Sequence, residues 1–190
     1  MTTLRLLTLS FILALATACT DSEYEYSSHQ AYLLLDNSTH LDATLSSALV
    51  QLSPGIFCRI YTKGDNYFYF ESNQGLSSKS AMTAVDLQRT LILGVYNASG
   101  IIVGYGTLDY PATLYCYDNQ CPNCYEQLSL PRYALTMDDT GIATCSKCSR
   151  SYNLNNGGII TEGGEEGDIK LFRYRVTYTE ASRILWVNNL

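Results

Sequence analysis

Residues 121–124 read CPNC and residues 145–148 read CSKC, with twenty residues between the two motifs. Each is a C-x-x-C, and this spacing lets two short turns face each other and offer four thiolates to one tetrahedral ion. Four sulfurs suit a structural zinc ion and also a single iron ion. We therefore predict a metal centre with the ligands Cys121, Cys124, Cys145 and Cys148.

A disulfide framework is the main alternative, since four cysteines allow three pairings. A bond within one C-x-x-C closes a very small ring and is strained, so bonds between the two motifs are easier to form. A catalytic redox role is disfavoured, because neither motif lies in a βαβ pattern. We expect the separate Cys58 and Cys116 to be small buried hydrophobic residues, although a disulfide between them stays open.

Local sequence predicts how the motifs are held. Each follows an expected strand, at residues 114–117 and 142–144. Pro122 stiffens the first turn by fixing its own φ angle. Lys147 is expected to place a positive charge beside the second motif and to lower the pKa of its thiols.

The rest of the chain favours strands, with 16 tyrosines among 190 residues. Turn residues at 63–66 and 97–100 predict two hairpins. Leucines at helical spacing over residues 41–52 predict one helix, capped by Ser38 or Thr39. We thus predict an all-β, antiparallel protein with one short N-terminal helix.

The beginning of the chain has the pattern of an export signal. Residues 1–18 combine Arg5 with a short apolar run and small residues, and this run is too short to span a bilayer comfortably. Residues 15–19 (LATAC) resemble a bacterial lipobox that would place a lipid on Cys19. Ordinary secretion with an unmodified cysteine is the alternative. Residues 19–28 then form an acidic tether.

The net charge of the chain limits the kinds of molecule that it is expected to bind. The formal net charge of −6 argues against nucleic acid and against recruitment by anionic lipid. No second apolar stretch approaches membrane length, so we expect contact with the membrane through the N-terminal lipid only. The expected location is the cell envelope, lipid-anchored to a bacterial membrane on its periplasmic or outer-surface face. The expected partner is an unidentified envelope protein.

The two cysteine loops, with strands expected at 100–103, 114–118 and 171–174, resemble the Rieske-type ferredoxin fold, specifically a divergent group of Rieske-like envelope lipoproteins. The resemblance covers about the last ninety residues. It implies an antiparallel sandwich or barrel with a zinc-ribbon-like tip of two ligand loops. Residues 96–190 would form this domain, and residues 29–95 would pack on it.

The chain departs from that family at the ligands. A Rieske centre uses two histidines on one iron, whereas here Cys124 and Cys148 stand in the second-ligand positions. The acidic, glycine-rich residues 161–168 replace the proline-bearing loop that shields the family's cluster. These changes point to an all-cysteine [2Fe–2S] cluster or a zinc centre.

Our favoured interpretation is a non-enzymatic binding or scaffold lipoprotein in which zinc fixes the two loops. The rival is an electron-transfer protein with an all-cysteine [2Fe–2S] cluster or a rubredoxin-like iron. We expect His29 and His40 at the surface, and the sequence offers no Ser/His/Asp arrangement and no catalytic residue.

Overall fold

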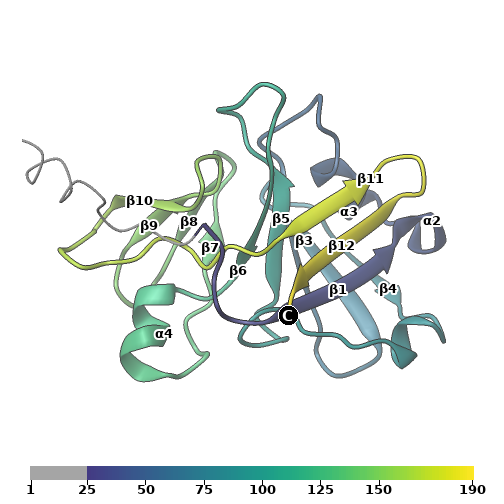
Figure 1. Ribbon diagram of the computed structural model, residues 1–190, viewed down its shortest axis with the longest axis horizontal. Coiled ribbons are helices and arrows are strands. Elements are labelled where there is room, and N and C mark those ends of the chain that lie inside the picture. The colour runs from purple at the N-terminus through teal and green to yellow at the C-terminus, as the bar shows by residue number, and fades with distance from the viewer. Residues whose placement is uncertain (1–24) are drawn as a thin grey trace, which may run out of the picture.

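The computed structural model describes residues 25–190, so the expected signal segment, Cys19 and most of the acidic tether lie outside the described residues (Figure 1). Strands predominate over helices in the described chain, and every pairing between named strands is antiparallel, which agrees with the all-β expectation. In chain order the elements are β1 (Ala31–Asp36), α2 (Asn37–His40), α3 (Ala43–Ala48), β2 (Phe57–Tyr61), β3 (Tyr67–Ser72), β4 (Ser77–Ala81), η1 (Asp86–Gln88), β5 (Ile101–Tyr105), β6 (Leu114–Asp118), α4 (Pro122–Leu128), β7 (Thr136–Met137), β8 (Ile142–Thr144), β9 (Ser151–Asn153), β10 (Ile159–Glu162), β11 (Val176–Thr179) and β12 (Ile184–Asn189).

Three sheets build the molecule. A five-stranded sheet, in the order β4-β3-β2-β5-β6, lies at the centre. A three-stranded sheet, β1-β12-β11, and a four-stranded sheet, β10-β9-β8-β7, accompany it. Figure 1 shows the β7–β10 lobe with α4 to one side and the β1-β12-β11 sheet to the other. Because β1 pairs with β12 and β2 pairs with β5, the parts expected at 29–95 and 96–190 share sheets.

The central sheet separates two hydrophobic cores because side chains alternate between its faces. One face presents Cys58, Ile60 and Val103 to a first core that includes α3 and the β1-β12 pair. The other face presents Ile102 and Tyr117 to a second core within the β7–β10 lobe. Strand β5 is covered on both faces and is buried along its whole length.

The leucines of residues 41–52 do not form one helix. Leu41 adopts a left-handed conformation (φ 51°) that ends α2, and Asp42 then caps α3 through the N–H of Leu45. Asp36 caps α2 in place of the expected Ser38 or Thr39. Only Leu45 and Leu49 of the predicted apolar stripe are buried, whereas Leu41 and Leu52 are exposed. Two capping carboxylates therefore override the helical spacing.

The strand predictions have mixed outcomes, and in the expected strand at 171–174 only Arg173 forms an isolated bridge, to Tyr117. The hairpin across residues 63–66 forms as expected between β2 and β3. The second predicted hairpin is wrong, because residues 90–96 form no strand and β5 pairs with β2 and β6. The serine-rich residues 72–80 were expected as a loop, yet β4 forms there as an edge strand, half exposed and polar.

Candidate metal centre

Both cysteine motifs follow strands, as the sequence predicts. Strand β6 leads through residues 119–120 to Cys121, which is the N-cap of α4. Pro122 then begins this helix at a position that needs no N–H, and Cys124 lies in its first turn. Helix α4 was not expected from the sequence. Strand β8 leads directly to Cys145, and Cys148 lies three residues before β9.

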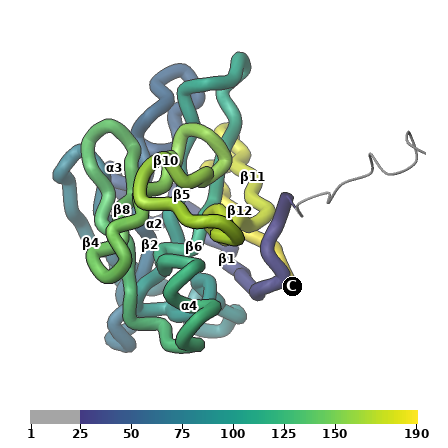
Figure 2. The backbone as a smooth tube through the Cα atoms, turned by 90° about the vertical axis from the view of Figure 1, so that its left-hand side faces the viewer, coloured from purple at the N-terminus to yellow at the C-terminus, as the bar shows by residue number. Residues whose placement is uncertain are grey.

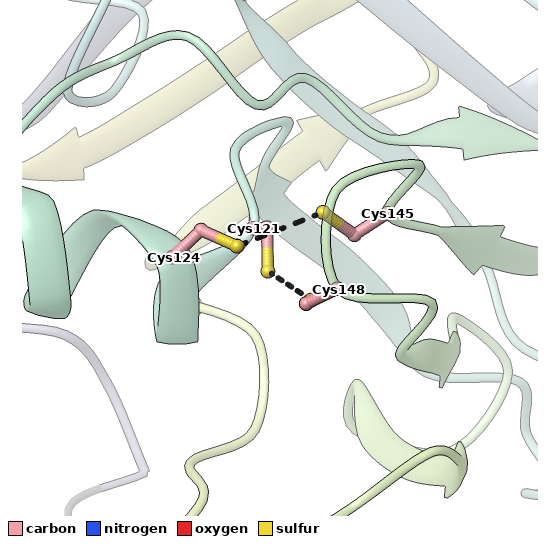
Figure 3. A group of neighbouring side chains, drawn as sticks. All are labelled: Cys121, Cys124, Cys145 and Cys148. Carbon is pink, nitrogen blue, oxygen red and sulfur yellow. Dashed lines mark hydrogen bonds between the residues drawn. The ribbon is translucent and has the colours of Figure 1, made fainter.

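The four sulfurs lie close together, with all ligand atoms within 4.8 Å of one another (Figure 3). The Cys121–Cys148 Sγ distance is 3.6 Å and the Cys124–Cys145 Sγ distance is 3.9 Å. A tetrahedral ion with metal–sulfur bonds of about 2.3 Å requires sulfurs about 3.8 Å apart. The two distances lie on either side of this value, so the four side chains fit one metal ion.

The centre is largely shielded from water. Cys121, Cys124 and Cys145 are buried in the second core, and Cys148 is partly exposed. All four thiols are free. An apolar enclosure of this kind excludes competing water ligands, which favours a closed four-thiolate site.

Tyr152 and Asn123 order the first motif from outside the ligand set. The Tyr152 hydroxyl lies 3.3 Å from Cys121 Sγ and accepts a hydrogen bond of 3.0 Å from Asn123 Nδ2. The hydroxyl proton is therefore left to donate to the sulfur. Asn123 is itself fixed by two hydrogen bonds with the backbone of Ile169. Contacts of this type orient metal ligands and tune the charge on sulfur.

Arg150, and not Lys147, is the cation beside the second motif. Lys147 is exposed, whereas Arg150 is buried and lies close enough to Cys148 to lower the pKa of its thiol. Asp168 (2.6 Å) and Glu165 (3.3 Å) hold the guanidinium. Two carboxylates of the acidic residues 161–168 therefore hold this arginine. Sequence spacing could not predict these ion pairs, because the two carboxylates lie 15 and 18 residues from Arg150 along the chain.

The metal-free thiols differ in acidity. Burial raises the pKa of Cys121 to about 11, against the opposing effect of the Tyr152 hydroxyl. Burial also raises the pKa of Cys124. At Cys148 burial acts in the same direction, but hydrogen bonds from Arg150 and from the other cysteines outweigh it and lower the pKa to about 7. Of Cys121, Cys124 and Cys148, Cys148 is thus the thiol most readily ionised at neutral pH.

Cys58 and Cys116 are buried and free, as expected for small hydrophobic residues. Val103 of β5 pairs with Cys58 on one side and with Cys116 on the other. Two strand spacings separate Cα atoms by about 9.6 Å, beyond the reach of a disulfide. The bond left open by the sequence is therefore absent, and burial raises the pKa of both thiols.

His40 is buried, whereas the sequence predicted it at the surface. Its side chain is only 1% exposed, with Nδ1 2.8 Å from Ser80 Oγ and Nε2 3.2 Å from Asp86 Oδ2. These residues do form a Ser/His/Asp arrangement, which no local signal could reveal because 46 positions separate them. Asp86 also accepts hydrogen bonds from the backbone and hydroxyl of Thr83. A cavity of about 280 Å³ beside His40 is lined by Asp86 but not by Ser80, so the cavity does not present the serine to a substrate.

His29 lies in a different setting, partly exposed and 3.4 Å from Glu126 of α4. A cavity of about 510 Å³ is lined by residues 25–29, Glu126 and residues 169–173, and none of the four cysteines lines it.

Within residues 25–190 there is no helix with the length and apolar character needed to cross a membrane. No family model, curated protein or solved structure matches the chain.

Proposed function

We propose that this chain is an exported metal-binding lipoprotein in which one zinc ion, held by the four cysteines, fixes a binding or scaffold domain. The observation that carries the proposal is the closed cluster of four sulfurs, all within 4.8 Å of one another. Four thiolates leave no open coordination position for a substrate, which is the arrangement of structural zinc sites. The ion would join the α4 region to the β7–β10 lobe.

The compactness of the cluster favours one ion over an all-cysteine [2Fe–2S] cluster. In a two-iron cluster each iron takes its own pair of protein ligands, so sulfurs of different pairs lie farther apart than around a single ion. Here all four Sγ atoms lie within 4.8 Å of one another, whichever way the cysteines are paired.

A single redox-active iron is the second candidate function. The same four sulfurs suit a rubredoxin-like iron. Partial exposure of Cys148 favours it, because a ligand at the surface offers a short path for an electron to a partner.

The Rieske-like relationship and the location belong to the same proposal. Support for the relationship is the chain order β5, β6, first motif, second motif. We propose a Rieske-like sandwich with a zinc-ribbon-like tip, anchored to a bacterial envelope membrane through a lipid on Cys19. Its partner would be an envelope protein. The net charge of −6 argues against binding to nucleic acid.

Elemental analysis and a visible spectrum of the purified protein test the proposal. One zinc per chain in a colourless protein is expected. A coloured protein with stoichiometric iron would overturn the zinc assignment in favour of electron transfer, and a metal-free protein with cross-linked cysteines would overturn both. Cys148→Ala should lose the metal, whereas Cys116→Ala, which removes a buried thiol outside the centre, should keep it.

A further inference from the structure

Two neighbouring loops carry large apolar side chains that no part of the described protein covers. The α3–β2 loop exposes Val50 and Leu52, and the β5–β6 loop exposes Leu108 and Tyr110. Leu52 is 94% exposed, Leu108 is 62% exposed and Tyr110 is fully exposed. Figures 1 and 2 show both loops projecting at the top of the molecule. We call these four side chains the apolar tip.

The loops are held together at their base. Gln51 Nε2 donates to the carbonyl of Ala112 (3.1 Å), and the N–H of Gly55 donates to the carbonyl of Tyr105 (2.7 Å). The side chain of Asn73 also bonds the carbonyl of Gly55 (3.1 Å). The apolar tip is therefore carried by two loops that are hydrogen-bonded to each other at their base.

The tip is almost free of charge. Residues 49–56 carry no charged side chain, and residues 106–113 carry one, Asp109. That carboxylate accepts a hydrogen bond of 2.8 Å from the Thr113 hydroxyl and a longer one from Tyr115. Turn hydrogen bonds from Ser53 to Val50 and from Gly106 to Thr113 occupy part of the loop backbone. Few polar groups would thus lose water if the tip entered an apolar medium.

We infer that the apolar tip inserts into the interface of a zwitterionic lipid bilayer, which has no net charge. Side chains this exposed stand out from the surface, and a bilayer, unlike a protein partner, needs no pocket to match each of them. A tyrosine beside leucines suits the membrane interface, where the ring meets headgroups and the aliphatic chains go deeper. The net charge of −6 and the lack of lysine or arginine on the tip favour a zwitterionic over an anionic surface.

Tryptophan fluorescence with phosphatidylcholine vesicles tests this inference. The test chain begins at Thr20, which removes Cys19 and the apolar leader but keeps all described strands and both cores. Trp186, the one tryptophan, is replaced by Phe, and Tyr110→Trp places the probe on the tip. We expect a blue shift on adding vesicles that does not change between low and high salt.

Leu52→Asn with Leu108→Asn should lower vesicle partitioning by about tenfold or more, since the two inserted leucines together contribute at least that factor. The matched control, Leu41→Asn with Leu87→Asn, changes two exposed leucines away from the tip and should leave partitioning within about twofold. All four positions are exposed, so thermal melting should show both double variants folded. Absence of vesicle binding, equal losses in both variants, or self-association through the tip would each overturn the inference.

Discussion

The cysteines of the centre have the same chemical group in different surroundings. Cys121 is buried beside the Tyr152 hydroxyl, whereas Cys148 is partly exposed beside the Arg150 guanidinium. Burial opposes ionisation at the first thiol, and hydrogen bonds to a cation promote it at the second. The order in which the thiols accept a metal should therefore start at Cys148.

Removal of the Tyr152 hydroxyl tests its role in holding the first motif. Tyr152→Phe should weaken zinc binding by about 10–100-fold, because it deletes a contact that orients a ligand without touching the ion. Competition with a chromophoric chelator measures the affinity. Tyr117→Phe is the control, since this buried hydroxyl bonds the carbonyl of Leu154 and no cysteine. Equal affinities for the two variants would contradict the assigned role.

Proton release on zinc binding tests whether the four cysteines bind the ion as thiolates. At pH 7 Cys121, with a pKa of about 11, and Cys124, whose pKa is also raised, carry protons that zinc must displace. Addition of zinc to the metal-free protein should release roughly two or more protons per ion. Affinity should fall as the pH falls, because protons compete for sulfur. A pH indicator in weak buffer records the release, and no release would contradict the thiolate assignment.

At the scale of elements, β6 connects the central sheet to the metal centre through a buried carboxylate. Asp118 ends this strand three residues before the first motif and accepts hydrogen bonds from Val95, Gln120 and Tyr174. Burial raises its pKa to about 6, and these donors oppose the rise. The unfolded value is near 4, so the protonated form contributes stability below pH 4 that is lost as the pH rises through about 6.

Tyr174→Phe should make that pH dependence steeper. The hydroxyl lies 2.7 Å from the carboxylate and stabilises its charged form. We expect a loss of about 1.5–3 kcal/mol at pH 7.5 and about 1 kcal/mol at pH 5, where the folded carboxyl is mostly protonated. Denaturant unfolding at both pH values measures this. Tyr117→Phe should cost the same at both, and a similarly flat result for Tyr174→Phe would argue against the coupling.

The sequence predicts elements best where a short pattern determines them. Strands β2, β3, β6 and β8 and the four ligands follow from alternation and from C-x-x-C spacing. Strand β4 is not predicted because it is stabilised by pairing with β3 and not by its serines. The roles of three further residues are not predicted for a related reason; these are Arg150, Tyr152 and His40. Their partners are brought close only by the sheets, so no short sequence pattern contains them.

At the scale of the whole molecule, the central sheet divides the protein into parts that depend differently on the metal. The first core, with β1, β12 and α3, contains none of the four ligands, whereas the second core contains Cys121, Cys124 and Cys145 and packs against Cys148. The β7–β10 lobe has only short strands, of two to four residues. Such a lobe needs a further constraint, which an ion bridging both motifs would provide.

Removal of the metal should therefore loosen one side of the protein. We expect a strong chelator to increase hydrogen exchange in β7–β10 and α4, while β2, β3 and β5 stay protected by the first core. Mass spectrometry of peptides measures this. Chelator should add little to the exchange of Cys148→Ala, which already lacks the metal. Uniform loosening of both sides would contradict the division.

X-ray absorption at the edge of the bound metal reports directly on the ligands of the four-cysteine centre. A single ion held by Cys121, Cys124, Cys145 and Cys148 predicts one shell of four sulfurs at about 2.3 Å, with no neighbouring metal. A second metal in the spectrum, nitrogen or oxygen in the first shell, or the absence of bound metal would contradict a centre built from these four side chains.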